Sequence, residues 1–312
     1  MGIRASGDRL ARVFSLARTA GILVVAATLA VAAPPASAAP PDLRHASVDG
    51  VRIAYRTVGS GRPLLLVNGS GATLDTWDPA LLAGLGRFRR VIVFDPRGLG
   101  ASTDRPGNHI TIAQQADDVA GLLRTLRIAR VDVLGWSFGG FVTQELLVRH
   151  PGLVRRAVLV STDAGGPTAR RASLAVRRID DRGTLGTATL DESVALLFPV
   201  AGRAAGQAWF NRLIAQPGAC CAASPRAELQ DVVDAEDDWY LPGHGVRARL
   251  VGVRRRVLVT AGTVDIDIPA VNATTIARTI PGARLQRFTG GGHAFLIQFE
   301  RRFVTSVRGF LR

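Results

Sequence analysis

Ser137 stands at the centre of a Gly-x-Ser-x-Gly sequence that covers residues 135–139. The largely apolar run Val131–Leu134 precedes this motif and predicts a strand, and a helical pattern follows from Phe141. Strand, sharp turn and helix is the context in which Gly-x-Ser-x-Gly presents a nucleophilic serine. The flanking glycines suit so tight a turn because they lack a Cβ. The motif also occurs by chance in a chain with 34 glycines, so its interpretation depends on partners elsewhere in the sequence.

Strands and helices alternate along most of the chain. An Asp49-Gly50 turn predicts a hairpin within His45–Thr57. Apolar runs, typical of strands that are covered on both faces, occupy Pro63–Val67, Arg90–Phe94 and Val257–Ala261. A further strand is predicted over Val154–Ser161, with the apolar residues 157–160 at its centre, and a last strand over Ala283–Phe288. Helical patterns occupy Pro79–Leu85, Ile112–Leu126, Pro269–Ile280 and Phe295–Leu311. The alternation predicts an α/β fold with a mostly parallel sheet and helices on both faces.

Residues that could do chemistry follow the predicted strands directly. In a parallel sheet the carboxyl ends of the strands meet at one edge, and ligands bind there. The residues at these strand ends are Ser70, Asp95, Ser137, Asp163, Asp265 and His293. Their common location predicts one site built from segments that are far apart in the sequence.

The segment 164–254 breaks the alternation, because it has helical spacing and no buried strand run. We expect a helical lid here, inserted after the sixth strand between core segments 39–163 and 255–312. The apolar stretches Leu196–Pro199 and Trp209-Phe210 face either the pocket or the lid's own core. We interpret the acidic residues of 231–238 as a solvated face; they are Asp231, Asp234, Glu236, Asp237 and Asp238.

From about His45 to its end, the chain resembles the α/β-hydrolases. Five motifs carry the resemblance: an oxyanion loop at 68–71, an Asp-x-Arg-Gly-x-Gly-x-Ser turn at 95–102, the serine turn at 135–140, an acid turn at 262–265 and a histidine turn at 292–294. The order Ser, Asp, His is also the order of this family. Many members have His-Gly where this chain has Asn68-Gly69, which leaves the subgroup open.

The resemblance implies a catalytic triad. Ser137 is expected to be the nucleophile, His293 the base that takes its proton, and Asp265 the acid that orients His293. Asp163 is a rival for the role of the acid, and Asp267 is a weaker rival. Asp95 and Arg97 are interpreted as structural, and three other histidines, His45, His150 and His244, as surface or structural residues.

The remaining expectations concern the substrate. The backbone amides of Ser70 and Phe138 are expected to bind the developing oxyanion. Asn68, Gly69 and Trp136 are expected to bind the substrate, and the apolar side chains near Ser137 favour an uncharged, apolar acyl group. No metal or other cofactor is expected, because the sequence contains no metal-ligand spacing.

The first 38 residues have the pattern of a secretory signal peptide. Four arginines precede the apolar stretch Gly21–Ala33, and Ala36-Ser37-Ala38 is typical of a cleavage site. We therefore expect a secreted protein, extracellular or associated with the cell wall. The alternative is an uncleaved anchor, which the short apolar stretch disfavours.

The net charge of +14 suits either a loose association with an anionic cell surface or a solubilising arginine surface. No nucleic-acid motif is present, and aromatic residues make up only 6% of the chain, so no nucleic-acid partner is expected. Cys220 and Cys221 form either a vicinal disulfide or a pair of small buried side chains. The sequence does not predict the oligomeric state.

These observations together predict a secreted serine hydrolase that cleaves small-molecule esters or lipid esters through an acyl-enzyme. Peptide, amide or lactone hydrolysis and cofactor-free perhydrolysis are alternatives at the same site. A ligand-binding protein without catalysis on the same scaffold is an alternative of another class. A dehalogenase or epoxide hydrolase is disfavoured, because such relatives need a carboxylate nucleophile where this chain has Ser137.

Overall fold

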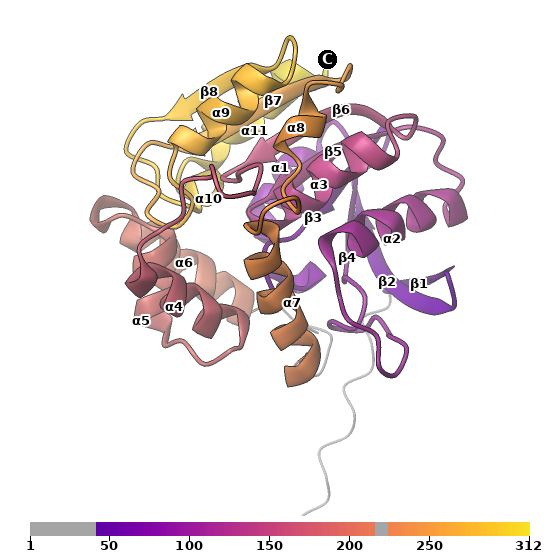
Figure 1. The fold of residues 1–312 in the computed structure, drawn as a ribbon, viewed down its shortest axis with the longest axis horizontal. Coiled ribbons are helices and arrows are strands. Elements are labelled where there is room, and N and C mark those ends of the chain that lie inside the picture. Colours follow the sequence, from indigo (N-terminus) through magenta and orange to yellow (C-terminus); the bar gives the residue numbers. More distant parts are fainter. Residues whose placement is uncertain (1–41, 216–223) are drawn as a thin grey trace, which may run out of the picture. The chain divides into compact units, whose positions relative to one another are not determined.

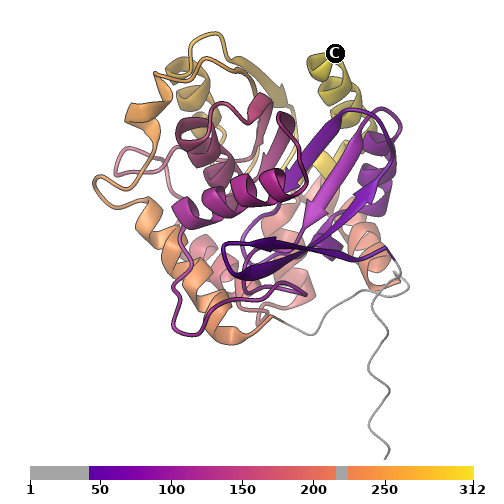
Figure 2. The same cartoon turned by 90° about the vertical axis from the view of Figure 1, so that its right-hand side faces the viewer.

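An eight-stranded sheet lies at the centre of the part of the chain that the computed structural model describes, residues 42–215 and 224–312 (Figure 1). The strand order is β1-β2-β4-β3-β5-β6-β7-β8. Strand β2 is antiparallel to β1 and β4, and the other neighbours are parallel. Figure 2 shows the twist of the sheet, with the hairpin of β1 and β2 (indigo) at its edge. The strands are β1 (Arg44–Val48), β2 (Val51–Val58), β3 (Pro63–Val67), β4 (Arg90–Phe94), β5 (Val131–Trp136), β6 (Val154–Val160), β7 (Arg256–Gly262) and β8 (Arg284–Phe288).

Helices cover both faces of the sheet, and alternation along each strand divides the core between them. In β3, for example, Leu65 and Val67 join one hydrophobic cluster, while Leu64 and Leu66 join the other. The first cluster lies under α2 (Ile112–Thr125), α3 (Phe138–Arg149) and α9 (Val271–Thr279). The second lies under α1 (Pro79–Gly86), α10 (Phe295–Gln298) and α11 (Glu300–Leu311). A 3₁₀ turn, η1 (Leu74–Thr76), precedes α1.

The lid consists of helices between β6 and β7, as the sequence predicts. They are α4 (Leu174–Thr184), α5 (Leu190–Leu197), the 3₁₀ turn η2 (Val200–Gly202), α6 (Arg203–Ile214), α7 (Arg226–Trp239) and α8 (Arg247–Leu250). Figure 1 shows α4, α5 and α6 grouped together, with α7 beside them. Helix α7 packs against both α4 and α2 and so connects the lid to the core. None of the helices in residues 42–215 and 224–312 is long and apolar enough to span a membrane.

The predicted α/β-hydrolase fold is confirmed, with two local differences. The helix expected from Pro269 begins at Val271. The helix expected over Phe295–Leu311 is interrupted at Phe299, whose backbone has φ −120° and ψ 40°. Aromatic rings on both sides of this break, Phe295 and Phe303, pack against Phe288, so the interruption lets the chain fold around that ring.

Some predictions lie outside the described residues. The predicted signal peptide, residues 1–38, is among them, as are Cys220 and Cys221. The boundaries predicted for the lid and for the two core segments remain predictions.

Candidate active site

The turn from β5 to α3 holds Ser137 in a backbone conformation that is rare for an L-residue, with φ 57° and ψ −124°. A positive φ costs free energy in a residue other than glycine, and it persists only where the surrounding structure fixes it. Two backbone hydrogen bonds contribute here: the Ser137 amide donates to the Val160 carbonyl at 2.9 Å, and the Gly140 amide donates to the Ser137 carbonyl at 2.8 Å. The turn therefore presents the Ser137 side chain at the carboxyl end of β5.

The glycines of the motif allow this turn to pack against its neighbours. A Cβ on Gly135 would clash with the Gly139 carbonyl, and a Cβ on Gly139 would clash with the carbonyl oxygens of Val67 and Asn68 at the end of β3. Glycine at both positions is therefore a packing requirement. The close approach also brings the loop after β3 next to Ser137.

His293 follows β8, and its ring is hydrogen-bonded to Asp265. The distances from His293 Nδ1 are 3.0 Å to Asp265 Oδ2 and 3.2 Å to Oδ1. Both residues are buried. The backbone carbonyl of His293 accepts hydrogen bonds from the Trp136 indole at 3.2 Å and from the Ser161 hydroxyl at 2.9 Å. These contacts fix the histidine turn to the ends of β5 and β6.

The Asp265 carboxylate is held by its own loop as well. Its Oδ1 accepts the backbone N–H groups of Asp267 at 3.0 Å and of Ile268 at 2.9 Å. A carboxylate that is fixed in this way presents its other oxygen to the histidine in one orientation. This arrangement suits a group that orients an imidazole.

Asp163, the rival candidate for the acid, has other partners. Its carboxylate accepts hydrogen bonds from the Trp239 indole at 3.0 Å, the Tyr240 hydroxyl at 2.7 Å and the Gly165 amide at 2.8 Å. Burial raises the pKa of Asp163. The structure thus places Asp265 on the histidine and Asp163 between the core and the end of α7.

Asp267, the weaker rival, lies on the opposite edge of the His293 ring. Its Oδ2 is 3.5 Å from His293 Nε2. Burial by itself lowers the pKa of His293, but the carboxylates of Asp265 and Asp267 outweigh it and raise this pKa to about 10. The sequence did not predict that Asp265 and Asp267 would both lie beside the His293 ring.

The residues predicted to form the oxyanion hole adjoin the serine. A Cβ on Gly69 would lie 3.5 Å from the Cβ of Ser137, which places this loop beside the nucleophile. Phe138 is the first residue of α3, so its amide has no carbonyl partner within the helix. Asn68 does not line the pocket with Gly69 and Trp136; its side-chain amide donates to the Ala72 carbonyl at 3.3 Å.

The side chain of Ser70 has a partner that the sequence did not suggest. Its hydroxyl donates to Glu236 Oε2 at 2.6 Å. Burial and the nearby Asp180 raise the pKa of Glu236 to about 8. The prediction that the whole acidic run of α7 is solvated is therefore wrong at Glu236, which points toward the oxyanion loop. Its neighbours Asp234, Asp237 and Asp238 are exposed, in line with that prediction.

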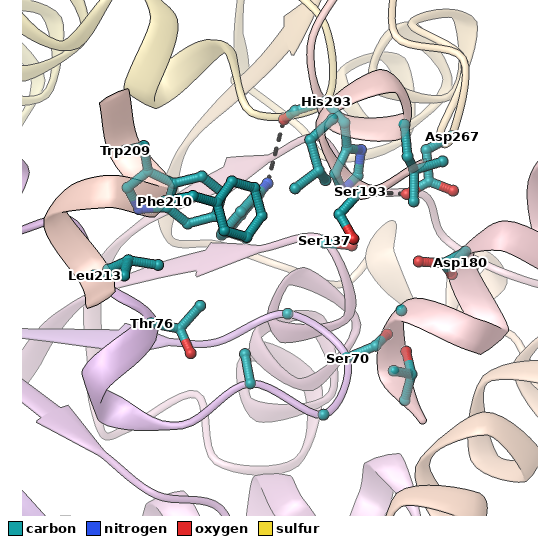
Figure 3. Close-up of a pocket in the computed structure, with 18 residues that line it drawn as sticks. Ser70, Thr76, Ser137, Asp180, Ser193, Trp209, Phe210, Leu213, Asp267 and His293 are labelled. Atoms are coloured by element: carbon teal, nitrogen blue, oxygen red, sulfur yellow. Dashed lines mark hydrogen bonds and ion pairs between the residues drawn. The ribbon is translucent and has the colours of Figure 1, made fainter. Parts of the chain in front are cut away.

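Ser137 and His293 line one pocket of about 280 Å³ (Figure 3). Its large apolar side chains are those of Trp136 from the core and, from the lid, Leu196, Leu197, Trp209, Phe210 and Leu213. The Trp136 ring lies between Trp77 and Trp209, at centroid distances of 6.0 and 6.2 Å. The acidic side chains on the pocket wall are Asp180 and Asp267, so the pocket has an apolar part and an acidic part.

Asp95 and Arg97 have the structural contacts that the sequence predicts for them. The Asp95 carboxylate accepts the backbone amides of Leu74 at 2.7 Å and Ala101 at 2.8 Å. The Arg97 guanidinium pairs with Asp118. Within residues 42–215 and 224–312, no group of His, Cys, Asp or Glu is arranged to hold a metal ion.

Comparison with known proteins agrees with this architecture. The family model of the alpha/beta hydrolase fold matches residues 62–182. An uncharacterized protein of Mycobacterium tuberculosis is 31% identical over 298 residues, which cover 86% of this chain and 81% of the relative. A crystal structure of a hydrolase from Pseudomonas aeruginosa has 31% identity and a TM-score of 0.69, with 87% and 98% of the two chains covered.

A crystal structure of an esterase from Rhodococcus sp. ECU1013 has 27% identity and the same TM-score, with 86% and 98% covered. The chain therefore belongs to the α/β-hydrolase family, and proteins that are named as hydrolases are among its relatives.

The strained turn gives a stability prediction. We expect Ser137→Gly to be more stable than Ser137→Ala by about 1 kcal/mol, because glycine relieves the positive φ and this gain exceeds its entropic cost. The free energy of unfolding in urea measures the difference. Ser193, inside α5, is the matched control. There the Ser193→Gly variant is expected to be less stable than the Ser193→Ala variant by about 1 kcal/mol. If the glycine variant were less stable than the alanine variant at both serines, the backbone at Ser137 would not be strained.

Proposed function

We propose that this protein is a secreted serine hydrolase that cleaves carboxylic esters through an acyl-enzyme. Ser137 is the nucleophile, His293 the general base and Asp265 the residue that orients the base. The observation that carries the proposal is the Asp265–His293 hydrogen bond of 3.0 Å on the wall of the pocket that also contains Ser137. The relatives that are named as a hydrolase and an esterase support the same reaction class.

The reaction follows from these roles. Neutral His293 takes the proton of the Ser137 hydroxyl as its oxygen bonds to the ester carbonyl carbon. The amides of Ser70 and Phe138 donate to the oxyanion that forms, and each such donor is worth about 10²–10³ in rate. The imidazolium then gives its proton to the leaving alcohol, and the ester bond breaks. Water, deprotonated by His293, attacks the acyl-enzyme and releases the acid.

The pocket supports an uncharged substrate with an apolar acyl group. Trp209, Phe210 and Leu213 offer an apolar surface to the acyl chain. Asp267 on the same wall disfavours an anionic group when it is ionised, because like charges repel. We therefore place neutral esters above esters of dicarboxylic acids as substrates.

Secretion is part of the proposal. Its support is the arginine-rich start of the chain, the apolar stretch Gly21–Ala33 and the small residues Ala36 and Ala38, a pattern that directs export. The protein would then meet its substrate outside the cytoplasm.

The nucleophile can be tested without knowing the natural substrate. Wild-type protein is expected to react with a fluorophosphonate probe and to hydrolyse a p-nitrophenyl ester of a short neutral acid, because both reagents need an activated serine. Ser137→Ala is expected to lose labelling and turnover, while Ser193→Ala, a second serine of the pocket wall, keeps both. In-gel fluorescence measures the labelling, and absorbance measures the turnover. Labelling that persists in Ser137→Ala would refute the assignment.

The acid can be tested by a matched pair. Asp265→Asn is expected to lower kcat for the same ester by about three to four orders of magnitude, because the imidazole loses the carboxylate that orients and stabilises it. Asp163→Asn is expected to leave kcat within about tenfold and to lower the melting temperature, because that carboxylate joins the core to the end of α7. A larger kinetic loss in Asp163→Asn would reverse the assignment.

A further inference from the structure

The His293 ring lies between two carboxylates. Its Nδ1 is 3.0 Å from Asp265 Oδ2, and its Nε2 is 3.5 Å from Asp267 Oδ2. Nε2 is the nitrogen that must accept the Ser137 proton. Among the residues that the structure describes, the Ser137 hydroxyl has no hydrogen-bond partner, although Ser137 and His293 line the same pocket (Figure 3).

The backbone fixes the position of Asp267. The amides of Asp267 and Ile268 donate to the Asp265 carboxylate, so the carboxylate that orients the histidine also shapes the turn that follows it. Asp267 is buried, with 9% of its surface exposed. Its side chain lines the pocket that contains Ser137 and a small adjoining cavity beneath the lid. One turn thus delivers carboxylates to both edges of the ring.

We propose that Asp267 is a positioning residue that competes with the Ser137 hydroxyl for His293 Nε2 and thereby sets the pH above which the serine is activated. This inference rests on the proposed function, in which His293 is the base. When the ring is protonated, the Nε2–H group is held by the Asp267 carboxylate. When the ring loses that proton to solvent, the free Nε2 lone pair can accept the proton of Ser137.

The direction of the effect follows from the charges. A negative group near an imidazole stabilises its protonated form, and a protonated imidazole cannot act as a base. The pKa of His293, raised to about 10 by Asp265 and Asp267 against the effect of burial, supports the same direction. Removing the Asp267 charge must therefore lower the pH at which the base form appears.

The other titratable groups around His293 and Asp267 are mostly acidic, and they lie farther from the His293 ring. Asp180 of α4 faces both Asp267 and His293, and burial raises its pKa. Burial raises the pKa of Asp267 to about 7, and the carboxylates of Glu236 of α7 and Asp163 after β6 also raise it. Burial raises the pKa of Tyr240, which directly follows α7, so its phenol carries no charge.

The cations near Asp267 are two arginines, and each interacts with other side chains. Arg171 stacks on the Tyr240 ring at 4.1 Å and pairs with Asp237 at 2.5 Å. Arg177 lines the adjoining cavity and acts on Asp181. Both arginines line the adjoining cavity together with Asp267, but the largest charge effects on His293 come from Asp265 and Asp267. Asp267 is therefore the group whose removal changes the charge at Nε2 most directly.

The rate of fluorophosphonate labelling as a function of pH tests the proposal. We expect the acid limb of the wild-type profile to move down by at least about one pH unit in Asp267→Asn, which corresponds to about tenfold faster labelling near neutral pH. Asp234→Asn, which removes an exposed carboxylate from α7, is the charge-matched control and is expected to leave the profile unchanged. A rate that falls equally at every pH, or a limb that does not move, would overturn the proposal.

A second measurement separates this proposal from the proposed function. In Ser137→Ala, which is not labelled, NMR titration of the His293 ring is expected to give a lower pKa when Asp267→Asn or Asp267→Ser is added. An unchanged pKa in whichever of these double variants folds would overturn the role of Asp267. Wild-type protein that is not labelled at any pH would instead refute the proposed function, and the titration would still report on Asp267.

Discussion

The site depends on a backbone turn that is strained and cannot relax. Ser137 has a positive φ, and the turn is pressed against the end of β3 so closely that Gly139 has no room for a Cβ. The same contact that removes conformational freedom from the serine brings Gly69 and Ser70 to its side. A nucleophile and the loop that would bind an oxyanion are therefore products of one packing constraint.

The rest of the fold supplies partners to this turn from distant parts of the chain. The histidine turn is held by Trp136, the residue before the nucleophile, and by Ser161 at the end of β6. The lid reaches the same region through Trp239 and Tyr240 on Asp163, and through Glu236 on Ser70. These bonds join lid and core beside the pocket.

The sequence predicted the strands well where burial determines them. The runs Pro63–Val67 and Arg90–Phe94 match β3 and β4 residue for residue, because strands that are covered on both faces are continuously apolar. The interruption at Phe299 was missed because three aromatic rings on Phe288 decide it, and these contacts are tertiary.

The site was predicted only in part, because the sequence shows the order of residues but not their tertiary contacts. The order of Ser137, Asp265 and His293 and their positions after strands were readable from the sequence, and the structure brings Asp265 to the ring. The direction of individual side chains was not readable. Periodicity therefore could not distinguish the exposed Asp237 from Glu236, which meets Ser70, or foresee that Asp267 approaches Nε2.

The most direct test of the account is a crystal structure of the protein after reaction with a fluorophosphonate. We expect phosphorus bonded to Ser137 Oγ, a phosphonyl oxygen within hydrogen-bond distance of the Ser70 and Phe138 amides, and His293 Nδ1 still hydrogen-bonded to Asp265. A phosphonyl group on another residue would contradict it. A His293 ring turned away from both Asp265 and the adduct would contradict it as well.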